Sequence, residues 1–242
     1  MQECDECNSF FSENIEVHLD KFTRPFRTIA QIRGKSGVPS YKTKDKKSRI
    51  DFNKDKGLVS LETLDRRISD IDQERKKLTF NFEYEPYIPS AVHKSLVKMA
   101  LSIMPEDELR SFQHSIKWIL NPDHSNKLIT PQILRAIFIP GPNPNRILTA
   151  FLLRRKKNCT TEGIPFCVFV IGFGNFVFQV TIPSSNDKSG SFIVPFFPTP
   201  FELGDNDVGV GFMRFDLSSH EIVRDKKETF TFSYDGIEEI KE

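Results

Sequence analysis

The sequence predicts an α+β fold in which helices at the N-terminus and in the middle of the chain accompany a mostly antiparallel C-terminal sheet. Apolar residues recur at spacings of three and four between residues 15 and 29 and again between 92 and 119, which is the period of amphipathic helices. Beyond Asn121 and Pro122, continuous apolar runs such as IPFCVFVIG and alternating runs such as TFTFSYDG replace that period. Such runs are typical of strands, so we expect the helices to pack on a sheet.

The first helix is expected to start directly after a pair of cysteines near the N-terminus. Its apolar stripe consists of Ile15, Leu19, Phe22, Phe26 and Ile29. Pro25 lies inside this pattern and removes one backbone donor, so it should kink or split the helix. Gly34 is expected to mark its end.

Two further helices are expected in the middle of the chain, joined tightly as a helical hairpin. Ser90 can cap the first of them, and Pro105 suits the first turn of the second. Pro122 then stops the second helix, because the residue before a proline is restricted to extended backbone.

On these patterns the chain divides into three segments. Residues 1–40 hold the cysteine pair and the first helix, residues 41–88 a basic loop or hairpin with a connecting segment, and residues 89–242 an α+β domain. The second segment also contains a short pattern of helical spacing, followed by strand-like alternation. The spaced residues are Leu61, Leu64, Ile68 and Ile71, and the alternating ones are Phe80, Phe82 and Tyr84.

Composition excludes several broad classes of protein. The chain has 242 residues, a formal net charge of +1 and four cysteines, so neither a strongly basic nucleic-acid binder nor a disulfide scaffold is indicated. No apolar run reaches the length of roughly 18 residues that a membrane span requires, and no signal peptide opens the chain. We therefore expect a cytoplasmic protein that does not bind membranes.

One local charge asymmetry stands out against this balance. From Lys21 to Lys56 there are 12 Lys or Arg residues against three Asp and no Glu. The centre of this tract is poor in apolar residues, which favours a loop or an exposed hairpin. Its candidate phosphate-binding residues are Lys42, Lys44, Lys46, Lys47 and Arg49. The alternative is a solvated surface that binds nothing.

The opening stretch CDECN has the spacing of half a metal site. Cys4 and Cys7 are three residues apart at the start of a helix, where two thiolates can supply two of the four ligands of a tetrahedral zinc. A thioredoxin-like redox motif would require a strand before it, and only three residues precede Cys4 in this sequence. The remaining interpretation is a pair of reduced thiols at a frayed terminus.

The segment CDECNSFFSENIEVHLDKFTRPFRTIAQIRGKSGVP resembles the part of bacterial HNH endonucleases that follows their catalytic hairpin. The resemblance covers residues 1 to about 40 and extends by pattern alone to AVHKSLVKMALSIMPEDELRSFQHSIKWIL. It implies metal-dependent phosphodiester hydrolysis of DNA, with Cys4 and Cys7 as ligands of a structural zinc. Asn8 would match the last residue of the family motif, near a catalytic divalent ion such as magnesium.

The sequence departs from this family in what precedes Cys4. The first cysteine pair, the catalytic histidine and the central asparagine of the family all belong upstream, so we expect an incomplete or inactive form. Two chains could pool their cysteines in a homodimer. The alternative is a non-catalytic module that binds nucleic acid through residues 21–56 or binds protein.

The remaining candidates are weaker. His18 lies too far along the helix to replace the catalytic histidine and is expected to be solvated. His93, His114, His124 and His220 show no helical pairing, and Gly172 and Gly174 suit a hairpin turn. The basic run from Arg154 to Lys157 is expected to be a solvated strand end, and Cys167 a small buried thiol.

Overall fold

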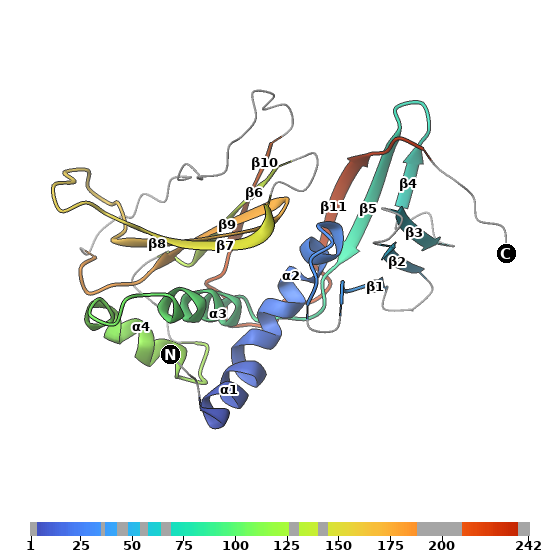
Figure 1. Ribbon diagram of the computed structural model, residues 1–242. Helices are drawn as coiled ribbons and strands as arrows, with labels where there is room; N and C mark the ends of the chain where they lie inside the picture. The colour runs from blue at the N-terminus through green and yellow to red at the C-terminus, as the bar shows by residue number, and fades with distance from the viewer. Residues whose placement is uncertain are drawn as a thin grey trace. The chain divides into compact units, whose positions relative to one another are not determined.

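The computed structural model describes residues 4–34, 37–42, 48–53, 58–63, 69–125, 131–139, 145–187 and 210–236. It confirms the α+β class, with helices at the N-terminus and in the middle and with antiparallel sheets (Figure 1). The chain forms two compact units that are interleaved along the sequence. The first unit comprises Met1–Phe22 and Pro86–Val223, and the second comprises Thr23–Glu85 and Arg224–Glu242.

The N-terminal helical segment is longer and more continuous than the proline suggests. Helix α1 (Asp5–Phe11) leads into a π-helical turn, η1 (Ser12–Glu16), and then into α2 (Val17–Ile29). Pro25 lies inside α2 without splitting it. The helix ends at Ile29 rather than at Gly34, because Gln31 adopts a positive φ of 52°, the left-handed backbone that terminates many helices.

In the first unit, two helices pack with one five-stranded sheet. Helix α3 (Pro89–Ser102) is followed by a 3₁₀ turn, η2 (Leu109–Phe112), and by α4 (Gln113–Ile119), so the helical hairpin is present although its second helix begins later than Pro105. The strand order is β10-β6-β9-β8-β7, and every pairing is antiparallel. Figure 1 shows α3 lying beside this sheet and α4 next to α3.

The five strands have clear boundaries. They are β6 (Ile133–Phe138), β7 (Asn145–Arg154), β8 (Cys167–Gly174), β9 (Phe176–Ile182) and β10 (Gly211–Asp216). All residues of β8 and β9 are buried, as their continuous apolar sequences predict. Gly174 has a φ of 54° at the turn between these strands, which confirms a hairpin turn rather than a phosphate-binding loop.

The core of this unit is rich in aromatic rings. The Phe22 side chain, which is fully buried, has its ring centroid 5.4 Å from that of Tyr87 and 5.2 Å from that of Phe215. The Phe178 ring of β9 lies 6.3 Å from it. The first half of α2 is therefore held to the sheet by edge-to-face aromatic contacts.

The second unit contains two three-stranded sheets, of orders β1-β2-β3 and β11-β5-β4. Their strands are β1 (Tyr41–Lys42), β2 (Ser48–Asn53), β3 (Leu58–Thr63), β4 (Ser69–Asp72), β5 (Lys77–Glu83) and β11 (Lys227–Ser233). Phe80 and Phe82 are buried in β5, which confirms the alternation. The helical interpretation of Leu61 and Ile71 is wrong, because these residues lie in β3 and β4.

None of the helices among the described residues is long and apolar enough to cross a membrane.

Candidate functional site

The cysteine pair lies at the first turn of α1, with Cys4 as its N-cap. The backbone N–H of Cys7 donates a hydrogen bond to Cys4 Sγ at 3.3 Å, and the Cys4 side chain is exposed. The pKa of the Cys4 thiol is lowered by its side-chain hydrogen bond with Cys7 and by the Cys7 backbone N–H. A thiolate is the form that attacks electrophiles and binds metals, so this local geometry favours a soft metal ligand.

Asn8 follows on the same turn, which also carries two acidic residues. Its backbone N–H donates to the Cys4 carbonyl at 2.9 Å, and its side chain is exposed. Asp5 and Glu6 are also exposed in this first turn. Carboxylates stabilise a helix N-terminus and attract cations, so the turn suits a metal ion better than a phosphate.

The turn that carries the cysteines is anchored through η1. The Lys98 ammonium, from α3, pairs with the Glu16 carboxylate at 2.6 Å and lies 4.7 Å from the centroid of the Phe11 ring. Phe11 is buried and Ile15 is fully buried. The segment that presents Cys4 and Cys7 is therefore fixed against α3 by an ion pair, a cation–π contact and two apolar side chains.

Cys4 and Cys7 are not joined by further metal ligands in the part of the chain that is described. Among those residues, no group of three or more His, Cys, Asp and Glu side chains could hold a metal ion. Burial raises the pKa of the Cys167 thiol to about 12, so this thiol stays protonated in β8. Cys159 is exposed in the connection between β7 and β8. A zinc ion at Cys4 and Cys7 would thus need two ligands from another source.

The basic tract contains a β-hairpin. Strand β1 pairs antiparallel with β2, and Lys42 lies directly opposite Arg49 in this pairing. Both side chains are exposed, and Arg49 also forms an ion pair with Asp51. Two like charges in opposite positions repel each other, and the Asp51 carboxylate offsets part of this repulsion at Arg49. Lys44, Lys46 and Lys47 lie outside the described residues.

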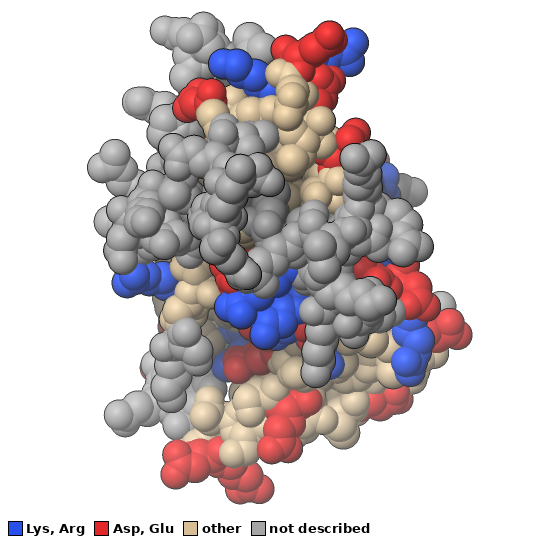
Figure 2. Space-filling model, turned by 90° about the vertical axis from the view of Figure 1, so that its right-hand side faces the viewer, with Lys and Arg blue, Asp and Glu red and all other residues tan. Residues whose placement is uncertain are grey.

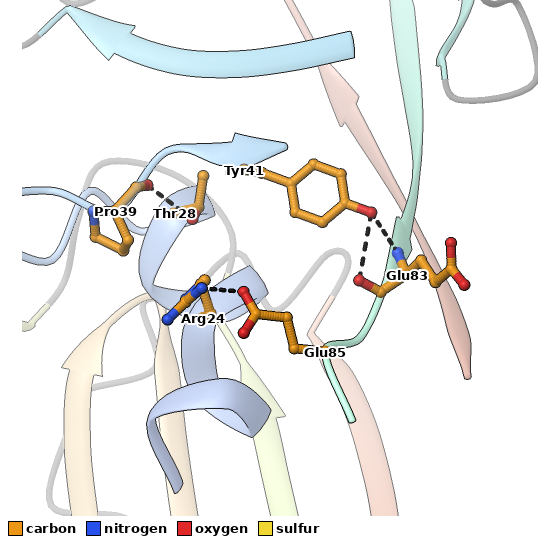
Figure 3. A network of polar contacts seen from close by, with 6 residues as sticks. All are labelled: Arg24, Thr28, Pro39, Tyr41, Glu83 and Glu85. Atoms are coloured by element: carbon orange, nitrogen blue, oxygen red, sulfur yellow. Dashed lines mark hydrogen bonds and ion pairs between the residues drawn. The ribbon is translucent and has the colours of Figure 1, made fainter. Parts of the chain in front are cut away.

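Polar contacts fix the base of this hairpin (Figure 3). The Tyr41 hydroxyl accepts the Glu83 backbone N–H at 2.6 Å and donates to the Glu83 carbonyl at 3.3 Å, so it ties β1 to the end of β5. The Thr28 hydroxyl donates to the Pro39 carbonyl at 2.9 Å. An ion pair joins Arg24 to Glu85. Lys42, next to Tyr41, therefore has a defined position in the second unit.

Basic and acidic side chains both occur among the described residues on the face of the molecule that Figure 2 shows. In the basic run from Arg154 to Lys157, Arg154 forms an ion pair with Glu108 and Arg155 donates to the carbonyls of Ile164 and Asn186, whereas the two lysines are exposed.

The sequence does not predict the burial of Lys94, a basic residue of α3 in the first unit. The Lys94 side chain is fully buried, and its ammonium donates to the carbonyls of Asn121 at 2.6 Å and Asp123 at 2.9 Å. Burial lowers the pKa of Lys94 to about 8, against the opposing effect of the Asp123 carboxylate. The ammonium also lies 5.4 Å from the Trp118 ring centroid. Lys94 thereby satisfies the carbonyls that follow α4.

Two histidines of this unit, His93 and His18, contact backbone groups through their ring nitrogens. His93 is fully buried, with Nε2 3.2 Å from the Thr181 carbonyl, and burial lowers its pKa to about 4. The expectation of a solvated His18 is wrong. His18 is half-buried, its Nδ1 accepts the Ile88 backbone N–H at 3.1 Å, and its ring centroid lies 6.1 Å from that of His124. No pattern in the sequence indicates this pair, because tertiary packing brings the two rings together.

Comparison of the chain with family models, with curated proteins and with solved structures finds no match.

Proposed function

We propose that this chain is an inactive form of an HNH-type DNA endonuclease, in which Cys4 and Cys7 supply half of a structural zinc site. The observation that supports this most is the hydrogen bond from the Cys7 N–H to Cys4 Sγ, within a turn that Phe11 and the Lys98–Glu16 ion pair hold against α3. Two such thiols fit zinc by donor type, and a bound zinc would stabilise this turn.

The other two ligands would come from outside the described residues. A second copy of the chain is one source, since two copies would together provide four thiolates in a tetrahedral set. Asn8 would lie beside the second, catalytic ion of a complete HNH site. That ion has no ligand set among the described residues. A cytoplasmic location suits reduced thiols of this kind.

Cleavage of DNA tests the catalytic side of this proposal. No histidine of the sequence occupies the catalytic position of the family, so the purified chain is expected to leave plasmid and single-stranded DNA intact with magnesium, manganese or nickel. Agarose-gel assays over a range of metal concentrations provide the measurement. Robust cleavage that disappears in Asn8→Ala would contradict this expectation, because it would place a working nucleophile activator beside Asn8.

A second candidate function is a non-catalytic nucleic-acid module. It is favoured by the cross-strand pair of Lys42 and Arg49 at the base of an anchored hairpin. Lysines and arginines on such a hairpin would contact phosphates without reading bases, so binding would be weak and tolerant of sequence.

Duplex binding as a function of salt concentration tests this module. Changing Lys44, Lys46, Lys47 and Arg49 to Ser is expected to weaken binding and to reduce the logarithmic salt slope by up to about 3.6, because each of the four phosphate contacts would contribute about 0.9. The matched control removes four other exposed charges, at Lys117, Lys156, Lys157 and Lys227, and should leave the slope unchanged.

Fluorescence anisotropy with a labelled duplex measures both quantities. If the hairpin variant and the wild-type chain have the same affinity and the same slope, the hairpin is not the contact surface. If neither protein binds at low salt, the module hypothesis fails and a protein-binding role replaces it.

A further inference from the structure

The first unit contains two histidines that join its N-terminal helical segment to the start of α3 and to the loop after α4. His18 lies in the first turn of α2, and Ile88, whose N–H it accepts, is the N-cap of α3. The ring of His124 is hydrogen-bonded to the backbone of Asn14 in η1, and its own carbonyl accepts the Ser90 hydroxyl at 3.2 Å. The two residues therefore connect three segments of the unit.

The direction of the hydrogen bond at His18 fixes its protonation state. A backbone N–H can only donate, so Nδ1 of His18 must carry a lone pair. A protonated imidazole has an N–H on both nitrogens and cannot accept this bond. Protonation of His18 thus removes the partner of the Ile88 N–H, one of the donors at the start of α3 that has no acceptor within the helix.

The surroundings of both rings oppose a positive charge. Nδ1 of His124 is buried and has no hydrogen-bond partner among the described groups, so a proton placed there would gain no acceptor. Lys94 from α3 adds positive potential at His124, and Lys21 from α2 and His124 add it at His18. Asp123 is the carboxylate that acts in the opposite direction on His124.

We propose that His18, with its ring packed against His124, is an acid-sensitive latch, which holds the start of α2 to the N-cap of α3 while its imidazole is neutral and opens when it is protonated. The latch lies ten residues or more from the cysteines in sequence and involves neither of them, so it is independent of the proposed zinc site. Its opening would release one of the contacts that fix the segment carrying Cys4 and Asn8.

The direction of the pH dependence follows from the closed state. Burial, reinforced by the charges of Lys21 and His124, lowers the pKa of His18 to about 4, and burial also lowers the pKa of His124. The closed state binds fewer protons than the open state, so its advantage is complete above a pH of about 6.5 and declines as the pH falls toward 4. For His18 the equilibrium is expected to change by up to about a hundredfold over this window.

Hydrogen exchange at the Ile88 amide measures the latch directly. The protection factor of this amide is expected to fall at least tenfold between pH 6.5 and pH 5 in the wild-type chain. In His18→Asn, the Asn Oδ1 can accept the Ile88 N–H but does not titrate, so the protection factor should become nearly independent of pH. The exposed His220→Asn is the matched control and should behave as wild type.

The Ile88 protection factors of the wild-type chain and the two variants are compared at each pH. This comparison removes acid effects that all three proteins share, such as protonation of the buried His93. NMR titration of the His18 ring in the wild-type chain provides a second measurement that needs no variant. The latch is overturned if the Ile88 protection factor is constant with pH, if His18→Asn retains the wild-type dependence, or if His18 titrates near pH 6.5.

Discussion

Changing Lys94 to Met is expected to lower the free energy of unfolding by about 2 to 3 kcal/mol, although the side chain is replaced by an apolar one of similar length. The Lys94 ammonium is the hydrogen-bond donor to the carbonyls of Asn121 and Asp123, and its side chain is fully buried. Methionine would fill the space but leave both carbonyls without this donor. The cost of unsatisfied acceptors then exceeds the gain from no longer burying a charge.

Urea denaturation followed by circular dichroism measures this loss. Trp118, the single tryptophan of the chain, lies against Lys94, so its fluorescence gives an independent signal from the same region. Lys117→Met is the matched control, because Lys117 is exposed on α4, the helix that carries Trp118. Its replacement should change the free energy of unfolding by less than about 0.5 kcal/mol. A Lys94→Met protein as stable as wild type would show that the ammonium does not stabilise the loop after α4.

The parts of the fold that the sequence predicts are those where one local pattern decides the structure. The period of α2 and the apolar runs of β8 and β9 each determine their own element, and the glycine at position 174 determines the turn between the two strands. Pro25 does not split α2 as its missing backbone donor predicts, because the buried Phe22 and Phe26 on either side of it stabilise the helix through packing.

Other features depend on partners distant in the sequence. The spacing of Leu61 and Ile71 fits a helix, but β3 pairs with β2 and β4 pairs with β5, so cross-strand contacts override the local period. Strand β11 completes the second unit by pairing with β5, although the whole sheet of the first unit lies between them in sequence. No local pattern contains that information.

The candidate functional residues also differ in whether a local sequence pattern or a distant partner decides their environment. Cys4 and Cys7 can be proposed from spacing alone, because a two-residue separation at a helix start suits a pair of metal ligands, whereas Asn8 rests on the resemblance to HNH endonucleases. Lys94, His18 and His124 could not be identified, because their environment is created by helices and a loop that meet only in the folded unit. An isolated lysine or histidine in an amphipathic helix has no sequence signal that distinguishes burial from solvation.

The proposed zinc half-site gives the second large expected effect: where two chains pool their cysteines, removing either thiol should abolish metal binding. Titration with cobalt(II) under reducing conditions reports thiolate coordination through a charge-transfer absorption band, and zinc then competes for the same site. The exposed Cys159 provides the matched control. Cys4→Ser and Cys7→Ser should each lose the band, whereas Cys159→Ser should retain it.

The most direct test of the proposed zinc half-site is the ratio of zinc to chain, measured by elemental analysis on protein whose mass is determined by light scattering. Two thiolates cannot complete a tetrahedral site, so the monomer should hold zinc weakly or not at all, and a dimer should hold one zinc per two chains. One tightly bound zinc per monomer, or metal binding that survives Cys4→Ser, would contradict the half-site.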